Sequence, residues 1–242
     1  MSKPAMTIQE PMVSGPFAPP EGDYERFLFS VSHDLQEPLR MIASYLKLLE
    51  MKAGTDLSPE AQQFLKGGLQ SADRMKDMIY ALVELSRVGR NNEVPQGIDV
   101  NSALQDLSNM YSHELNQVGG KIVWDKLPNV KMVPSQMLEL FKILIQNAID
   151  NASDRSLEIR VSGKDLGDQV ELTFADNGVG IKSVYLDKVF ELFKKVDQRS
   201  ANIGAGLAIA KEIIRKYEGE IRLTSDEGVG TAIVFTLPSD NT

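Results

Sequence analysis

Apolar side chains recur every three or four residues between residues 27 and 49, which is the spacing of one face of a long helix. The stretch AGTDLSPE, residues 53–60, interrupts this pattern. Gly54 favours the end of a helix, and Ser58 followed by a proline is typical of the start of another. A second apolar stripe runs from residue 65 to residue 85. We therefore predict two antiparallel helices joined by a short turn, a helical hairpin.

A hairpin by itself offers no third element on which to bury two apolar stripes. Two copies of it form a four-helix bundle that covers both stripes, so we favour a homodimer. The alternative is that the stripes pack against the rest of the same chain, and the pattern leaves that alternative open.

The segments on either side of the hairpin lack apolar periodicity. Residues 1–22 contain five prolines, and we interpret them as a disordered leader or as a linker to something upstream. The hairpin is assigned to residues 23–89, and residues 90–98 are interpreted as a second linker. Residues 99–242 then form the second predicted domain.

Beyond the linker the pattern alternates between the helical and the strand period. Helices alternate with short strands, and two of the strands are joined by a turn at residues 165–168. Helices on one side of a mixed sheet predict an α+β sandwich. The predicted helices are 101–115, 134–152 and 206–219, and the predicted strands are 121–127, 156–164, 169–176, 220–225 and 231–238.

Composition narrows the classes of function. The net charge of −8 argues against a partner with a phosphate backbone, so no nucleic acid is expected. The chain has no cysteine and two histidines, which excludes disulfides, thiolate chemistry and a histidine-rich metal site. No apolar run approaches the roughly 18 residues of a membrane span, and no signal peptide is visible. We expect a cytoplasmic protein.

His33 is the first candidate for chemistry. It lies about 200° around the helix from the apolar stripe, so its side chain is expected to face solvent. A neutral imidazole is a good nucleophile, and Asp34 beside it is able to orient the ring or take a proton. Pro38 removes a helical hydrogen bond and is expected to kink the helix nearby. By itself an exposed histidine is usually an ordinary surface residue.

The second half of the chain supplies glycine-rich turns that suit phosphate. FADNGVGI, residues 174–181, places an acid at the end of a strand, and IGAGLAIAK, residues 203–211, opens a helix with glycines. Such turns let backbone N–H groups approach phosphate at a helix N-terminus. Asn147 on an earlier helix offers an oxygen for magnesium. Each feature is weak alone, whereas the ordered set is specific.

With these motifs in this order, the sequence resembles the dimerisation and catalytic core of sensor histidine kinases in two-component signalling. SHDLQEPLR is similar to the phosphoacceptor segment of phytochrome-type kinases, and the resemblance covers about residues 24–238. It implies that the second domain has the ATP-binding fold of gyrase-type and Hsp90-type ATPases. It also implies that His33 is the phosphoacceptor and Asp34 its acid/base partner.

The same resemblance assigns a nucleotide site for ATP and Mg²⁺. Asn147 is expected to hold magnesium, Asp176 to accept from the adenine amino group, and Lys195 to reach the phosphates. The glycines expected to shape the site are Gly178, Gly180, Gly204 and Gly206. Each residue also has an ordinary structural explanation, which stays open. Asn147 would be a solvated helix residue, Asp176 would cap a turn, and Lys195 would belong to a solvated lysine pair.

Three positions of the expected nucleotide site depart from the family pattern. Ile143 stands where a second asparagine is usual, Asp150 where a lysine is common, and Asn202 where the second glycine-rich motif begins with glycine. The departures predict weaker ATP binding than that of a kinase with the full motif.

The leading hypothesis is an ATP-dependent protein-histidine kinase that autophosphorylates His33 and passes the phosphoryl group to an aspartate of a response-regulator receiver domain. Its signal would come from an upstream sensor domain or a sensor partner. The alternative is a dimeric histidine phosphotransfer or adaptor protein with a degenerate nucleotide site. A stand-alone ATPase is disfavoured by the complete phosphoacceptor hairpin.

Overall fold

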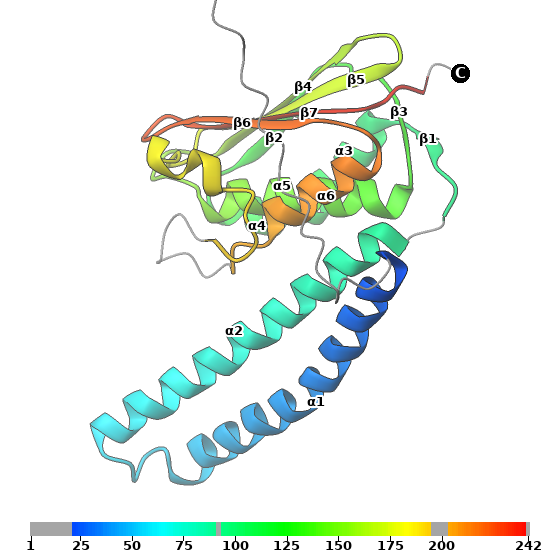
Figure 1. Cartoon of the computed structure of the whole chain (residues 1–242). Coiled ribbons are helices and arrows are strands. Elements are labelled where there is room, and N and C mark those ends of the chain that lie inside the picture. Colours follow the sequence, from blue (N-terminus) through cyan, green and yellow to red (C-terminus); the bar gives the residue numbers. More distant parts are fainter. Residues whose placement is uncertain (1–20, 91–92, 195–202, 241–242) are drawn as a thin grey trace, which may run out of the picture.

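The computed structural model describes residues 21–90, 93–194 and 203–240 of the 242-residue chain. It begins with two long helices, α1 (Glu21–Ala53) and α2 (Pro59–Arg90), which pack along each other as the predicted hairpin (Figure 1). α1 continues through Pro38. At the turn, Ser58 Oγ accepts a hydrogen bond from the backbone N–H of Ala61 at 3.2 Å, as the expected helix start requires. None of the described helices is long and apolar enough to cross a membrane.

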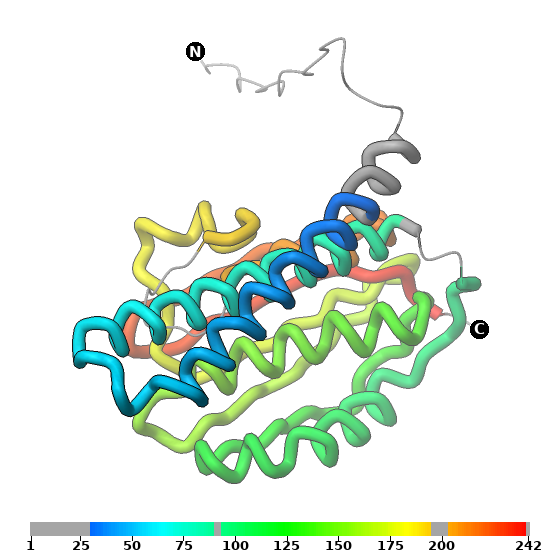
Figure 2. Tube along the Cα trace, turned by 90° about the horizontal axis from the view of Figure 1, so that it is seen from below, coloured from blue at the N-terminus to red at the C-terminus, as the bar shows by residue number. Residues whose placement is uncertain are grey.

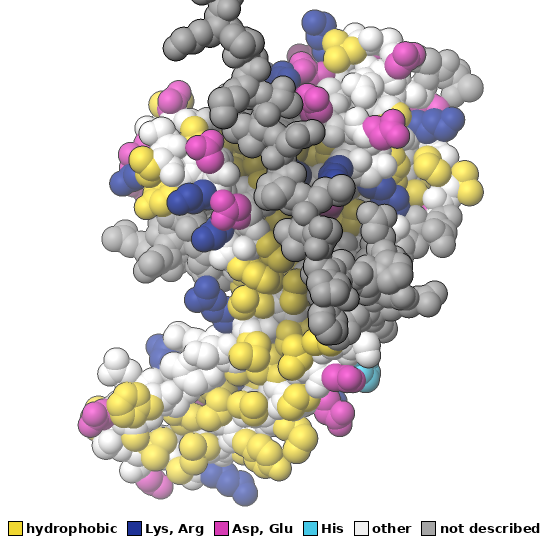
Figure 3. Space-filling model, viewed as in Figure 1, with side chains coloured by type: hydrophobic (Ala, Val, Ile, Leu, Met, Phe, Trp, Pro, Cys, Tyr) yellow, Lys and Arg dark blue, Asp and Glu magenta, His cyan; other side chains and the backbone are white. Residues whose placement is uncertain are grey.

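The hairpin buries few of its apolar side chains within one chain. Leu39, Ala72 and Ile79 form a small buried cluster. Leu35, Ile42 and other large apolar side chains of the same helices stay exposed, and Figure 3 shows hydrophobic surface extending along the hairpin. The hairpin therefore keeps an apolar surface that no part of the described chain covers.

The last turns of α2 behave differently, because they pack on the second domain. Ala81 and Val88 belong to the main core, and α2 lies against helix α6 (Gly206–Lys216). The carbonyl oxygen of Val88 accepts hydrogen bonds from Gln136 Nε2 at 3.0 Å and from Lys216 Nζ at 2.9 Å. Leu85, at the end of the second stripe, packs against the same core, so the alternative left open by the sequence holds for this end of the stripe.

The second domain is the predicted α+β sandwich. Its main sheet has the order β2-β4-β5-β7-β6, with β2 and β4 parallel and the other neighbours antiparallel. Its helices lie on one face of this sheet, and the hairpin runs across that helical layer (Figures 1 and 2). The strands of the sheet are β2 (Lys121–Trp124), β4 (Glu158–Asp165), β5 (Gln169–Asp176), β6 (Ile221–Asp226) and β7 (Gly230–Pro238).

Several short elements differ from the predicted ones. The single helix expected over residues 101–115 is two helices, α3 (Val100–Met110) and α4 (Ser112–Gln117), which meet at Tyr111. A small antiparallel pair, β1 (Gln96–Ile98) and β3 (Val130–Met132), and the 3₁₀ helix η1 (Ser183–Lys188) were not predicted. These elements are too short to show a clear hydrophobic period.

The core lies between the main sheet and helix α5 (Pro134–Asp150) with its neighbours. Alternate residues of β5 are buried, ending with Phe174, whose ring lies 5.0 Å from that of Phe141 on α5. The Phe174 ring also lies 6.0 Å from the Phe235 ring of β7. This packing fixes the polar end of β5, at Asp176, beside the last turns of α5.

Candidate nucleotide and phosphoacceptor sites

A groove of about 890 Å³ opens between α5, the loop that follows β5 and the start of α6. Five of the residues predicted for the nucleotide site line it together: Asn147, Asp176, Gly180, Gly204 and Gly206. Gly178 is buried and does not line the groove, and its backbone N–H donates to Asp176 Oδ1 at 2.9 Å. Lys195 and Asn202 lie outside the described residues.

Asp176 ends β5 and presents a largely buried carboxyl group to the groove. Burial raises its pKa above the usual value, while hydrogen bonds from the backbone N–H groups of Gly178 and Thr231 act in the opposite direction. A carboxylate held in this way accepts hydrogen bonds, which suits an exocyclic amino group of a base.

Asn147 lies in the last turns of α5, where its side chain borders the groove. Its Oδ1 accepts from Asn151 Nδ2 at 3.3 Å. Ile143, one turn earlier, lines the same groove with an apolar side chain. Asp150 does not line the groove, and Gln146 Nε2 donates to its carboxylate at 2.8 Å. Of these two departures from the family pattern, only Ile143 faces the site.

Two glycines of the groove have backbones that an L side chain rarely adopts. Gly180 has φ +69°, and a Cβ there would collide with the carbonyl oxygen of Asp226. Gly204 has φ +77°, and a Cβ there would collide with the carbonyl oxygen of Lys194. Both loops therefore pack backbone against backbone, and the groove walls depend on glycine at these positions.

The start of α6 suits an anion. This helix of 11 residues begins at Gly206 beside Ile143, and no side chain caps its first N–H groups. Lys194 and Lys142 line the same groove. Uncapped N–H groups at a helix N-terminus together with lysines attract phosphate.

Some groove residues were not identified as site residues from the sequence, notably Lys142, Glu139 and Tyr111. Burial raises the pKa of Glu139, and the carboxylate of Glu84 on α2 acts in the same direction. Burial also raises the pKa of the Tyr111 phenol, helped by nearby carboxylates. Tyr111 lies outside α5, and no motif near it in the sequence marks it as a site residue. Lys142 is adjacent in sequence to Ile143, so its place in the site was predictable.

His33 is highly exposed on α1, as predicted, with 74% of its side chain accessible. Its Nδ1 lies 3.3 Å from Asp34 Oδ1, and within the described residues Nε2 makes no hydrogen bond. A hollow of about 560 Å³ on the hairpin is lined by His33 together with Glu37, Arg40 and Lys76. This hollow and the nucleotide groove share no lining residue, so the structure does not bring His33 and Asn147 together.

Two family models match the chain in the order of its domains. Residues 24–91 match the His Kinase A (phospho-acceptor) domain, and residues 132–241 match the histidine kinase-, DNA gyrase B- and HSP90-like ATPase. Cyanobacterial phytochrome A of Nostoc sp. is 32% identical over 89% of this chain and 28% of its own length. Sensor protein kinase WalK of Staphylococcus aureus is 31% identical over 91% of this chain and 55% of its own length. The chain thus spans between a quarter and just over half of these relatives.

Solved structures show the same fold at low sequence identity. Full-length ShkA in complex with AMPPNP matches with a TM-score of 0.64 at 21% identity, over 89% of this chain and 46% of that one. Histidine kinase ThkA in complex with the response regulator protein TrrA matches with a TM-score of 0.60 at 15% identity, over 90% and 64%. With a phosphoacceptor hairpin followed by the matching ATPase domain, this chain belongs to the sensor histidine kinases.

Proposed function

We propose that the chain is an ATP-dependent protein-histidine kinase core that phosphorylates His33 and passes the phosphoryl group to a receiver-domain aspartate. The observation that carries this proposal is the pairing of two sites on one chain: the groove that gathers Asn147, Asp176 and Gly206, and the exposed pair of His33 with Asp34. The proposal includes the predicted domain boundaries and the predicted site residues.

The residues of the groove fit ATP. Asp176 offers a partly buried acceptor for the adenine amino group, and the start of α6 with Lys194 offers positive potential for phosphates. The ShkA structure, which has the same fold, is a complex with the ATP analogue AMPPNP. Asn147 would hold Mg²⁺ through its amide oxygen, and that ion would neutralise charge on the phosphates.

The geometry at His33 supports a nucleophilic role. When Nδ1–H donates to the Asp34 carboxylate, the neutral ring keeps its lone pair on Nε2. Nε2 then attacks the γ-phosphorus, and the bond to the bridging oxygen breaks, releasing ADP. The positive charge that develops on the ring is shared with Asp34. Transfer to a receiver aspartate would reverse the charge change on His33.

His33 does not line the nucleotide groove. The reaction therefore needs the groove and His33 to be placed differently relative to each other. Either the sandwich moves along the hairpin, or the groove of one subunit serves His33 of another. A homodimer through the exposed apolar surface of α1 and α2 is part of this proposal. A response-regulator receiver domain and an upstream sensor domain or sensor partner are its other proposed partners.

A second candidate is a dimeric adaptor or phosphotransfer protein that binds nucleotide poorly. Ile143 favours it, because an apolar side chain lines the groove where an amide oxygen is expected. Titration of magnesium-ATP separates the two functions: an absence of binding at millimolar ATP would favour the adaptor.

The direct test is incubation with radiolabelled ATP and magnesium, followed by assay for label that is labile in acid and stable in base. His33→Gln should abolish this label. The matched control is His113→Gln, which removes the other histidine from an exposed position on α4, where Gln117 is its hydrogen-bond partner at 3.0 Å. Equal labelling of wild type and His33→Gln would contradict the proposal.

A further inference from the structure

Arg155, in the loop between α5 and β4, contacts two segments that are distant in sequence. Its Nη2 donates to the carbonyl oxygens of Asn177 at 2.9 Å, Gly228 at 3.0 Å and Val229 at 3.2 Å, with Gly178 O at 3.5 Å. These acceptors lie between 22 and 74 residues further along the chain. One nitrogen with two hydrogens thus joins the nucleotide loop to the turn between β6 and β7.

The two segments that Arg155 joins also touch each other directly. The backbone N–H of Gly228 donates to the carbonyl oxygen of Val179 at 2.7 Å. Because Gly180 lacks a Cβ, its backbone lies against the carbonyl of Asp226. The carbonyl groups of both segments converge on the guanidinium, whose charge offsets their aligned dipoles.

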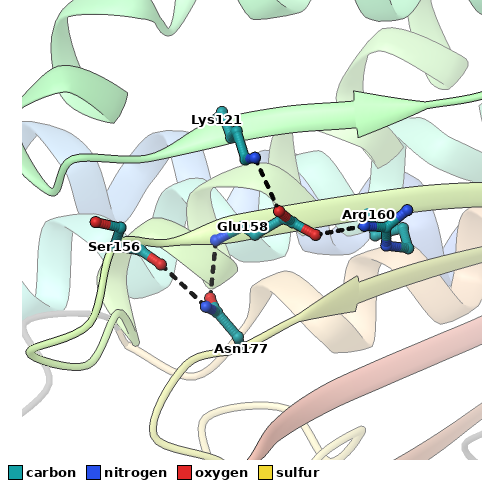
Figure 4. Close-up of polar contacts among 5 residues, drawn as sticks. All are labelled: Lys121, Ser156, Glu158, Arg160 and Asn177. Carbon is teal, nitrogen blue, oxygen red and sulfur yellow. Dashed lines mark hydrogen bonds and ion pairs between the residues drawn. The ribbon is translucent and has the colours of Figure 1, made fainter.

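The other side of the nucleotide loop is anchored without Arg155. Asn177 Nδ2 donates to the carbonyl of Ser156 at 2.9 Å, and the N–H of Glu158 donates to Asn177 Oδ1 at 2.8 Å (Figure 4). These bonds attach the loop to the start of β4. Arg155 strengthens the attachment to the opposite turn, beside the hydrogen bond from Gly228 N–H to Val179 O, so its removal should loosen one wall and leave the strand pairing intact.

Within the described residues, no carboxylate lies within ion-pair distance of Arg155. None of the ion pairs in the described part of the chain includes Arg155. Its side chain is exposed, and its Nε lies 3.4 Å from Ser153 Oγ, within hydrogen-bonding distance of the same loop. The guanidinium donates to carbonyl oxygens of one loop and one turn. It therefore holds these two backbone segments together.

We infer that Arg155 is a positioning residue for base recognition: it holds the loop that follows Asp176 against the β6–β7 turn, and so fixes the base-binding end of the nucleotide groove. This inference rests on the proposed nucleotide function. It concerns the end of the groove at Asp176, while the phosphate end at Lys194 and the start of α6 belongs to other elements. Loss of Arg155 should therefore weaken recognition of the base and spare recognition of phosphates.

The test compares Arg155→Ala, Arg155→Lys and the control Arg222→Ala, which removes an exposed arginine of β6 that forms an ion pair with Glu171 at 2.8 Å. Arg155→Ala should bind ATP about three- to tenfold more weakly by calorimetry, since multiple exposed hydrogen bonds are lost. Binding of inorganic tripolyphosphate should stay unchanged. Arg155→Lys should recover part of the ATP affinity, and Arg222→Ala should match wild type.

Hydrogen exchange of the nucleotide-free protein gives a readout that does not depend on the proposed function. The amides of Val179 and Gly228 should exchange faster in Arg155→Ala than in wild type, while those in the β5–β7 ladder stay protected. Unchanged exchange at both amides, or equal loss of ATP and tripolyphosphate binding, would overturn the inference. Failure of wild type to bind ATP would overturn the proposed function and, with it, the role in base recognition.

Discussion

At the scale of single residues, the candidate site contains titratable groups whose surroundings disfavour the charged form. Asp176 is the main case: burial raises its pKa, yet the ionised group is the better acceptor for an amino group. Ionisation of this carboxyl group therefore lowers the stability of the folded protein. The ionised group becomes useful only when a hydrogen-bond donor binds to it. This is the pattern expected of a binding residue, since a structural carboxylate is usually paired.

Asp176→Asn should lose ATP binding without losing stability. The folded protein holds the Asp176 proton more tightly than the unfolded chain, so ionisation lowers the free energy of unfolding as pH rises through the raised pKa. The neutral amide removes that cost, and the variant should be at least as stable as wild type at pH 7. The difference should shrink as pH falls toward about 4, near the pKa of an unperturbed aspartate.

Urea unfolding at pH 7 and pH 4, with calorimetry of ATP binding, checks both halves of this prediction. Because the amide presents donors toward the adenine amino group, affinity should fall at least about tenfold. A variant that is clearly less stable than wild type at pH 7 would instead make Asp176 a structural cap of its turn, the bland alternative that the sequence leaves open.

At the scale of elements, α5 carries the residue proposed to hold Mg²⁺ and the residue that departs from the family pattern beside it. Ile143, Asn147 and Asn151 follow one another at the helical interval of four residues and all line the groove. Two of them carry amide oxygens, and the apolar residue lies at the end where α6 begins. The helix therefore presents fewer oxygens toward the phosphates than the family pattern implies.

Ile143→Asn should tighten binding of magnesium-ATP by about three- to tenfold, because one polar contact contributes about 0.5–1.5 kcal/mol. The gain should vanish when EDTA removes the metal, which is the internal control. Since Ile143 is half-buried against Gly206, the variant should also lose about 1 kcal/mol of stability. Equal affinities of variant and wild type with magnesium present would contradict the prediction.

At the scale of the whole molecule, the hairpin and the sandwich bury their apolar residues in different ways. The sandwich closes its own core, and the end of α2 joins that core through Ala81 and Val88. The remainder of the hairpin keeps Leu35, Ile42 and Met75 exposed. The proposed homodimer would cover this apolar surface with a second copy of the chain.

Light scattering at micromolar concentration should give twice the 26.8 kDa mass of one chain. Ile42→Asp, which places a charge at a 54% exposed position of α1, should shift the protein toward monomer. The matched control is Leu166→Asp at the β4–β5 turn, where the side chain is 48% exposed and the mass should not change. A monomeric wild type would exclude the homodimer.

Much of this protein can be predicted from local pattern, because local pattern is sufficient for helices, turns and sequence motifs. The stripes of the hairpin, the solvent-facing position of His33 and the alternation of β5 follow from helix and strand periodicity. The glycine-rich turns at Gly180 and Gly204 follow from residue type, since both need backbone that other residues rarely adopt.

Only the tertiary structure decided the contacts between segments far apart in sequence. It placed Asp150 outside the groove and Tyr111 along it, and it attached the end of α2 to the sandwich. No periodicity predicts that Arg155 contacts the turn at Gly228, 73 residues away. Such contacts form when helices and strands pack against one another. Their energy depends on how the packed surfaces fit together, so the neighbouring residues in the sequence do not predict them.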